Sequence, residues 1–373
     1  MQLRGTGRTN RRAAAAAMAA TLLLAACGAG GSADARGASA AAPVPDVECA
    51  ASGKVRGSGS SAQQNAMKRW IQQYRLACPG VEVAYNPLGS GAGVAQFLRG
   101  ATAFGGTDQA LSAEDAEYSE GVCAGGRAID LPMAGGPIAI GYHLPGVSDL
   151  VLDARTLARL FDARITRWND PAIQRLNPGR TLPDLPVIPV HRADDSGTTQ
   201  NLNAYLKSAA RGAWPYPADK KWQAEGGQSG NGSDGVSTTV AQTEGAIGYF
   251  ELSFAAKRKI DTVRIATGAS RPVAPSTTSA SRGIAEAKIA GEGKDLALTL
   301  EYRTSAEGAY PIVLVTYEIV CDTGNAPETL PALKSFLAYT AGEEGQKQLP
   351  SIHYAPLPAS VATQVREVVG TLS

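Results

Sequence analysis

Val-Ile-Pro-Val-His-Arg-Ala-Asp-Asp-Ser-Gly-Thr-Thr, residues 187–199, places a short apolar run directly before a turn rich in charged and hydroxyl side chains. The run from Val187 to His191 predicts a buried strand. After the turn, Leu202, Tyr205 and Leu206 recur at helical spacing, which predicts a helix. A strand, a turn and a helix in succession are the unit of α/β folds, so this stretch indicates the fold class.

Two further turns near the start of the chain have the same character. Gly-Ser-Gly-Ser-Ser at residues 57–61 precedes apolar residues at helical spacing, so a helix is expected to start at the serines. The predicted strand Val81 to Tyr85 runs into Gly-Ser-Gly-Ala-Gly at residues 89–93 and then into a second helical pattern. Other strands are predicted at residues 137–144 and 311–320. This alternation predicts an α/β protein.

The three turns point to an anion as ligand. The first turn of a helix has N–H groups without internal partners and the positive end of the helix dipole. Serine and threonine hydroxyls can donate as well, and Arg192 supplies a planar fork suited to phosphate. Taken singly, each hydroxyl is more simply a helix N-cap, and Arg192 is more simply part of an ion pair. Three such turns in one chain favour convergence on one oxyanion.

Two details narrow the kind of site. None of the turns is followed by Gly-Lys-Ser/Thr, so the spacing of a nucleotide-binding P-loop is absent. Residues 104–109 read Phe-Gly-Gly-Thr-Asp-Gln and place Asp108 among glycines without a neighbouring base. Taken alone, Asp108 is more simply a turn residue.

Composition excludes several classes of function. The chain has 373 residues, 35 Lys and Arg against 34 Asp and Glu, 44% hydrophobic residues and 18% charged residues. Removal of the first 26 residues, which hold four arginines and no acid, leaves 31 basic and 34 acidic groups and a net charge of −3. This balance argues against a nucleic-acid arm and against disorder. Three histidines far apart in sequence leave little material for a metal site, and no cofactor is expected.

The N-terminal residues predict export and a lipid anchor. An arginine-bearing segment ends at Arg12 and is followed by an apolar run to Ala26, too short to span a bilayer, so residues 1–26 are predicted to be a signal peptide. Leu-Ala-Ala-Cys at residues 24–27 resembles the lipobox of bacterial lipoproteins, in which the cysteine receives acyl chains such as palmitate. An ordinary signal peptide with an incidental Cys27 is the alternative, and the export route stays open between the general secretory and twin-arginine pathways. Residues 27–48, rich in Gly, Ala, Ser and Pro, are predicted to be a flexible tether.

Four cysteines remain after Cys27 is assigned to lipid: Cys49, Cys78, Cys123 and Cys321. An even number outside the reducing cytoplasm allows three disulfide pairings. We favour Cys49 with Cys78, since both precede predicted neighbouring parallel strands. Free buried thiols are the alternative.

The segments quoted above resemble, in order, the phosphate-binding proteins of bacterial ABC-type phosphate importers. The resemblance runs from about residue 55 to residue 365, and its most specific element is Arg-Ala-Asp-x-Ser-Gly-Thr. Other matching segments are Thr-Arg-Trp-Asn-Asp-Pro-Ala-Ile at 166–173, Glu-Gly-Ala-Ile-Gly-Tyr at 244–249 and Tyr-Ala-Pro-Leu-Pro at 354–358. It implies that the chain captures inorganic phosphate and delivers it to a permease driven by an ATPase, on the outer face of the cell membrane of a bacterium of high-GC actinobacterial type.

The resemblance also implies the site. The phosphate-binding residues would be Ser61, Ala62, Ser90, Asp108, Arg192, Ser196, Gly197 and Thr198. Asp194 would brace Arg192 from behind, and Asp108 would select the protonated oxyanion. The chain departs from the family at 61–62, where the family often has Thr-Phe, so that an apolar ring beside the anion is missing. The glycine-rich residues 226–232 resemble a family loop with altered spacing, and no ligand is assigned to them.

The implied fold is the two-lobed periplasmic-binding-protein fold, or Venus flytrap, with two hinge crossovers. Lobe one would comprise residues 49–133 and 312–373, and lobe two residues 134–311. The alternative function is a secreted hydrolase, either a phosphatase or a serine hydrolase, that uses the same oxyanion cradle. The sequence shows no cluster of metal ligands of the kind that a phosphatase would need. A serine hydrolase would need a histidine beside its serine, and the candidate is His191, which is near Ser196 in the sequence. We expect no enzyme.

Overall fold

The computed structural model describes residues 47–285 and 287–373. The predicted signal peptide, Cys27 and residues 27–46 of the predicted tether lie outside the described residues. Within the described part of the chain, no helix combines the length and the hydrophobicity that a membrane crossing requires.

One nine-stranded sheet organises the described residues, in the order β2-β1-β3-β13-β4-β8-β6-β7 with β9 also paired to β4. Its strands are β1 (Gly53–Gly59), β2 (Val81–Asn86), β3 (Phe104–Thr107), β4 (Ala128–Tyr142), β6 (Ile188–Arg192), β7 (Gln228–Gly230), β8 (Ala246–Glu251), β9 (Asp261–Thr262) and β13 (Val313–Cys321). Two small sheets pair β5 (Val151–Asp153) with β10 (Arg264–Ala266) and β11 (Lys288–Ile289) with β12 (Leu298–Thr299).

The fifteen-residue strand β4 divides this sheet into two lobes. Up to Pro137 it pairs antiparallel with β13, and from Ile138 onward it pairs with β8, beginning opposite Glu251. The chain returns from the second lobe at Val313, which lies opposite Pro137. Both crossings between the lobes therefore lie side by side, and every residue of β4 is buried.

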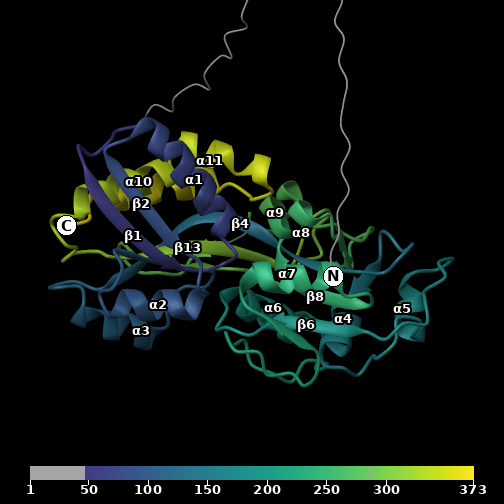
Figure 1. The fold of residues 1–373 in the computed structure, drawn as a ribbon. Coiled ribbons are helices and arrows are strands. Elements are labelled where there is room, and N and C mark those ends of the chain that lie inside the picture. Colours follow the sequence, from purple (N-terminus) through teal and green to yellow (C-terminus); the bar gives the residue numbers. More distant parts are fainter. Residues whose placement is uncertain (1–46, 286) are drawn as a thin grey trace, which may run out of the picture. The chain divides into compact units, whose positions relative to one another are not determined.

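Helices cover both faces of the sheet in the first lobe (Figure 1). On one face lie α1 (Gln64–Ala77), α10 (Leu330–Ala341), α11 (Glu343–Gln348) and α12 (Ala359–Gly370), and on the other α2 (Ser90–Leu98) and α3 (Ala113–Tyr118). The core of the first face contains Trp70, Tyr74 and Phe336, all nearly inaccessible to solvent. The apolar stripe that the sequence shows in α1 is the side that packs here.

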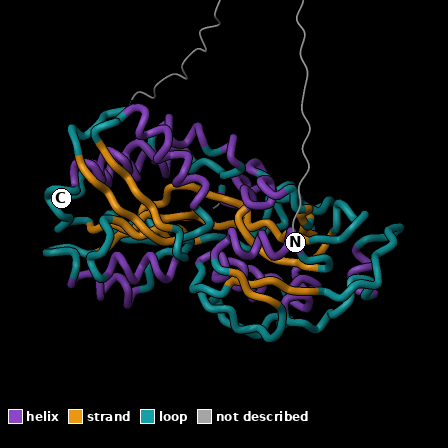
Figure 2. The backbone as a smooth tube through the Cα atoms, viewed as in Figure 1, coloured by secondary structure: helices purple, strands orange, loops and turns teal. Residues whose placement is uncertain are grey.

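The second lobe repeats the arrangement around the other half of β4 (Figure 2). A large apolar cluster joins α4 (Ala154–Phe161) and α6 (Gly197–Ala209) to one side of the strands, through residues such as Phe161 and Leu206. A smaller cluster joins α7 (Gly232–Gln242) and α8 (Leu252–Arg258) to the strands through Val236 and Phe250. The remaining helices are α5 (Pro171–Leu176) and α9 (Thr277–Ile284), with short 3-10 turns at Ser119–Gly121 and Pro350–Ile352.

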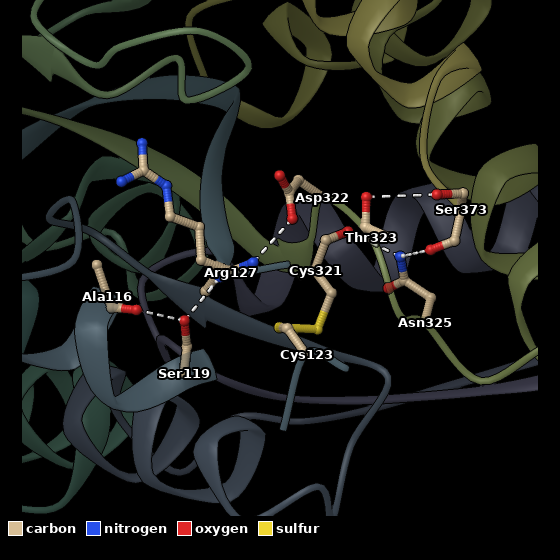
Figure 3. Close-up of a disulfide and its surroundings, with 10 residues drawn as sticks. Ala116, Ser119, Cys123, Arg127, Cys321, Asp322, Thr323, Asn325 and Ser373 are labelled. Carbon is tan, nitrogen blue, oxygen red and sulfur yellow. Dashed lines mark hydrogen bonds between the residues drawn. A yellow bond between two sulfur atoms is a disulfide. The ribbon is translucent and has the colours of Figure 1, made fainter. Parts of the chain in front are cut away.

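Two disulfides join distant parts of the first lobe. Cys49 is bonded to Cys78, which confirms the favoured pairing, and the strands that follow them are parallel neighbours. The second disulfide joins Cys123 to Cys321, at the end of β13 and 198 residues away (Figure 3). Around it, the Arg127 N–H donates to Asp322 at 2.8 Å, and the Asn325 amide donates to the Ser373 carbonyl oxygen at 3.1 Å.

Four strands predicted from apolar runs are present, with shifted limits. The strands predicted at 81–85 and 187–191 are β2 and β6, and the one at 311–320 begins two residues later, at Val313. The strand predicted at 137–144 is only the second half of β4. The first helix was expected at the serines but begins at Gln64, because residues 60–63 form a turn in which the Ala62 N–H donates to Ser60 Oγ at 3.0 Å.

Candidate functional site

Four helix N-termini meet between the lobes. Helices α1 and α2 come from the first lobe and follow the carboxyl ends of β1 and β2, while α6 and α7 come from the second lobe and follow β6 and β7. Parallel strands bring such ends to one edge of a sheet, which is where α/β proteins bind ligands. The sequence identified three of these turns, and the structure adds the N-terminus of α7 at Gly232.

Asp108 lies at the centre of this meeting point and is only 2% exposed. One carboxylate oxygen accepts a hydrogen bond from Thr198 Oγ1 in the second lobe at 2.9 Å, and the other accepts one from Ser60 Oγ in the first lobe. Its backbone N–H donates to Ser90 Oγ at 3.3 Å. Asp108 therefore connects the turns that contain Ser60, Ser90 and Thr198. Its role extends beyond the loop in which it lies.

Gly197 allows α6 to approach this carboxylate. A Cβ atom built on Gly197 would lie 2.7 Å from Ser90 Oγ and 2.8 Å from the Asp108 Cβ atom, closer than real contacts permit. Asn201, one turn further along α6, donates its amide to the Asp108 carbonyl oxygen at 2.8 Å and to the Gly197 carbonyl oxygen at 2.9 Å. Glycine in the Ser-Gly-Thr element is thus a requirement of packing between the lobes.

Arg192 projects from the end of β6 and is held from behind. Its Nε donates to Asp194 Oδ1 at 2.7 Å, its Nη2 donates to Asp194 Oδ2, and its side chain is 1% exposed. The remaining nitrogen, Nη1, is buried and has no hydrogen-bond partner among the described residues. A buried guanidinium donor is costly to leave unpaired, so this nitrogen is suited to an anionic ligand.

Three serines at the site share one arrangement: each hydroxyl oxygen accepts a backbone N–H. Ser61 Oγ accepts from Ser233 at 2.9 Å, Ser90 Oγ accepts from Asp108, and Ser196 Oγ accepts from Thr199 at 3.1 Å as the N-cap of α6. A hydroxyl that accepts in this way keeps its own proton for another acceptor. The N-cap role and a ligand role are therefore compatible at Ser196.

The predicted residues Ala62 and Thr198 already have internal partners for one donor each. The Ala62 N–H donates to Ser60 Oγ, and the Ala62 carbonyl oxygen accepts from the Tyr354 hydroxyl. The Thr198 hydroxyl donates to Asp108, which leaves its backbone N–H in the first turn of α6. The structure thus brings all eight predicted residues to one place, but the single donor of Ala62, its backbone N–H, is already used by Ser60.

Sequence reasoning missed Ser60 and Ser233. Ser60 bonds Asp108, whereas its neighbour Ser61 reaches across to Ser233 and to the N-terminus of α7. The signal for Ser233 was present, since Gly230, Asn231 and Gly232 precede it with the same glycine and polar character as the other turns. The Gly232 N–H also donates to Asp194 Oδ1 at 2.9 Å, so α7 supports the Arg192 brace.

Electrostatics at the site follow from burial and from these contacts. Burial raises the pKa of Asp108, against the opposing effects of hydrogen bonds from Ser60 and Thr198 and of the Arg192 charge. Burial also pushes the pKa of Asp194 upward, but the Arg192 hydrogen bonds and charge outweigh it, so that the pKa is lowered overall. Asp194 is therefore a stable anion beside Arg192, while Asp108 is a carboxylate that favours a hydrogen-bond donor.

Metal and hydrolase chemistry find no support here. Across residues 47–285 and 287–373, no group of three or more His, Cys, Asp or Glu side chains could hold a metal ion. The His191 ring stacks on Trp222 with its centroid 5.2 Å away, and its Nδ1 lies 3.0 Å from the carbonyl oxygen of Arg192. Neither contact turns His191 toward Ser196 as a general base would require.

Comparison with known proteins agrees with this geometry. Residues 44–344 match the model of a PBP superfamily domain. The chain is 41% identical over 350 residues to phosphate-binding protein PstS 3 of Mycobacterium leprae, a match that covers 93% of this chain and 94% of that protein. It is 42% identical over 354 residues to PstS 2 of Mycobacterium tuberculosis, with the same coverage. The chain belongs to the PstS family of phosphate-binding proteins.

The PstS family was the one expected from the turns, so that prediction is confirmed. A solved periplasmic phosphate-binding protein, PfluDING, superposes with a TM-score of 0.70 at 20% identity and covers 84% of this chain and 93% of its own. That likeness confirms the two-lobed periplasmic-binding-protein fold. The relatives named above are named for phosphate binding, and nothing in these matches supports the hydrolase alternative.

Proposed function

We propose that this PstS-family chain is an extracytoplasmic solute-binding protein that captures inorganic phosphate between its lobes and delivers it to an ABC importer. The observation that carries the proposal is the buried Arg192 guanidinium, whose Nη1 has no partner among the described residues and lies at the meeting point of four helix N-termini. The names of its relatives support phosphate as the anion.

The donors for phosphate would be Arg192 Nη1, the hydroxyls of Ser61, Ser90 and Ser196, and the first-turn N–H groups of Gly197 and Thr198. The three serine hydroxyls follow from contacts that occupy the acceptor side of each serine and leave its proton. A single guanidinium contributes the full positive charge, so most of the binding would come from dipoles. Micromolar retention needs about 8 kcal/mol, which six such charge-assisted hydrogen bonds can supply.

Asp108 would select phosphate over sulfate. Phosphate at neutral pH carries a proton that can be donated to a carboxylate, while sulfate would bring an unpaired negative charge beside one. Ser60 and Thr198 each occupy one Asp108 oxygen and hold the carboxylate in place, and each oxygen keeps a second acceptor site for the ligand. Ser60 would thus be a positioning residue that the family motif does not name.

Closure of the lobes would trap the ligand. Cross-lobe hydrogen bonds run from Thr198 to Asp108, from Ser233 to Ser61 and from the Gly91 N–H to the Asp195 carbonyl oxygen at 2.9 Å. A ligand stabilises the closed state only through contacts that it makes better there, and donors from both lobes provide them. We propose hinges within residues 133–137 and 309–312, supported by the change of partner of β4 after Pro137 and by the return of the chain at Val313.

Anchoring and export rest on the sequence alone. The pattern at residues 24–27 supports lipidation at Cys27, and a diacylglyceryl group supplies the two chains that stable membrane attachment requires. The permease and the ATPase would be separate chains, and we propose no nucleic-acid partner, no cofactor and no catalytic activity for this one.

Isothermal titration of the delipidated protein, stripped of bound anions, tests the proposal. We expect micromolar or tighter binding of phosphate and no measurable binding of sulfate at the same concentration. Equal affinity for both anions would contradict the role of Asp108. Turnover of a chromogenic phosphate ester that disappears in Ser196→Ala would instead support the hydrolase alternative.

A further inference from the structure

A cavity of about 570 Å³ opens on lobe two, and none of its lining residues belongs to the proposed phosphate site. Its walls come from the start of α4, the end of α6 and the segments 266–268 and 302–305. This volume lies in the range of about 300–1,000 Å³ that small-molecule sites occupy. The cavity is therefore large enough for a ligand bigger than one tetrahedral ion.

Three arginines from three separate segments line this cavity: Arg155, Arg211 and Arg303. None of the three forms an ion pair within the described residues, although five other arginines of the chain do. One carboxylate, Asp153, also lines the cavity, but it accepts the Thr156 N–H at 2.7 Å as the N-cap of α4. The wall thus carries an excess of two positive charges.

Hydroxyl-bearing residues line the same cavity as these arginines. Thr267, Thr304 and Ser305 line the cavity, each able to donate to an oxyanion. Guanidinium forks bind phosphoryl oxygens in pairs, and three forks from different segments suit several phosphoryl groups better than one. We propose that this cavity binds a small anion carrying two or more phosphoryl groups, as in a condensed phosphate or a phosphorylated headgroup.

Tyr302 connects the cavity to the phosphate site. Tyr302 lines the cavity, its hydroxyl donates to Asn201 Oδ1 at 2.6 Å, and the Asn201 amide donates onward to the Asp108 carbonyl oxygen at 2.8 Å. Gln109 of the first lobe also donates to the Tyr302 hydroxyl, at 3.4 Å. Tyr302 therefore makes contacts that belong to the closed lobes, and an anion that orders residues 302–305 favours closure. This coupling rests on the proposed function, whereas the cavity site does not.

Titration of tripolyphosphate into protein saturated with phosphate tests the site, because the cleft is then already filled. We expect saturable binding by the mature chain, weakened at least about tenfold by the pair Arg211→Gln and Arg303→Gln. The pair Arg75→Gln and Arg99→Gln removes the same charge from exposed positions outside the cavity and serves as control. If tripolyphosphate did not bind the mature chain, or if both double variants lost the same affinity for it, the proposed site would be wrong.

Two further arms identify the ligand source and the coupling. Vesicles containing a phosphorylated inositol lipid that bind the mature chain but not the Arg211 and Arg303 pair would support the site and assign it to a headgroup. Tripolyphosphate is expected to lower the phosphate dissociation constant of the mature chain but not that of Tyr302→Phe, since coupling between two ligands is reciprocal. An unchanged constant in the mature chain would remove the coupling, and failure of phosphate itself to bind would instead refute the proposed function.

Discussion

Ser61 Oγ accepts a 2.9 Å hydrogen bond from the backbone N–H of Ser233, a residue 172 positions further along the chain and in the opposite lobe. The two hydroxyl oxygens are also 3.3 Å apart, and either can be the donor of that contact. When Ser233 supplies both protons, the single Ser61 proton is directed to a ligand. This hydrogen bond therefore holds the two lobes together, and it also orients the Ser61 hydroxyl as a donor to phosphate.

Ser61→Ala is expected to weaken phosphate binding about tenfold to hundredfold, the usual cost of a hydrogen bond to a charged group. Ser233→Ala keeps the backbone N–H and should cost less than about fivefold. Calorimetric titration of both variants measures the difference. If Ser233→Ala were the more damaging substitution, the Ser233 hydroxyl would itself be a ligand, and the orientation described here would be wrong.

Asp108→Asn should weaken phosphate binding and reduce discrimination against sulfate. Ser60 and Thr198 both donate to the carboxylate, and an amide would turn its NH2 group toward one of them, so that hydroxyl would have to reverse from donor to acceptor. Asp195→Asn is the matched control, because Asp195 lies in the same turn as Arg192 and is exposed. Competition calorimetry with both anions measures selectivity, and selectivity equal to that of the unsubstituted protein would exclude Asp108 as the selecting residue.

Arg192→Lys should weaken phosphate binding at least about tenfold even though the charge is kept. The guanidinium uses two nitrogens for Asp194 and has a third left over, whereas one ammonium cannot hold the same brace and the ligand together. Asp194→Asn keeps the guanidinium and loses only part of the brace, so its effect should be smaller. A lysine variant with an unaltered dissociation constant would show that Arg192 Nη1 faces something other than the anion.

The sequence predicts which turns come together better than it predicts the strand limits. Glycine and hydroxyl side chains at a helix start are local chemistry, so the turns containing Ser61, Ser90 and Ser196 could be recognised without the fold. The first half of β4 was missed because Pro132, Gly135 and Gly136 argue against a strand when read alone. In the structure these residues pair with β13 in the centre of the sheet, which is a tertiary effect that local pattern cannot show.

The sequence also could not predict which residues form hydrogen bonds across the lobes. Which serine of the pair at positions 60 and 61 bonds Asp108 depends on the turn that delays α1 until Gln64. The role of α7 depends on where the second lobe meets the first. The Cys49 and Cys78 pairing could be favoured because both cysteines precede neighbouring strands, whereas the bond between Cys123 and Cys321 joins residues 198 positions apart and is seen in the structure.

The free energy of unfolding should fall as pH rises from about 4.5 to about 8, because of a buried carboxyl at the lobe junction. Burial raises the pKa of Glu251 from 4.5 to about 8, so the folded protein holds a proton that the unfolded chain releases. Asp130 behaves alike, since burial and the nearby Asp295 raise its pKa to about 8. Urea unfolding of the ligand-free protein at several pH values measures the slope.

Glu251→Gln should flatten that slope, because glutamine keeps the shape and loses the titrating proton. Its amide can still accept the Ser253 N–H that now bonds Glu251 at 2.9 Å. Asp130→Asn should remove a further part of the slope. A slope unchanged by both substitutions would mean that neither carboxyl holds its proton in the folded protein.

Loss of the Cys123 and Cys321 disulfide should destabilise the protein more than loss of the Cys49 and Cys78 disulfide. The two bonds close loops with sequence separations of 198 and 29 residues, and the chain-entropy model gives about 5 and about 3.5 kcal/mol for them. The longer loop contains the whole of lobe two, so its release enlarges the unfolded ensemble more. Two variants, each with both cysteines of one disulfide replaced by serine, are unfolded in urea without phosphate to compare their free energies of unfolding.

Both disulfides lie within the first lobe and away from the cross-lobe contacts, so phosphate affinity should stay the same in either variant. A larger loss from the Cys49 and Cys78 pair would show that native packing around Cys78, rather than loop closure, sets the stability.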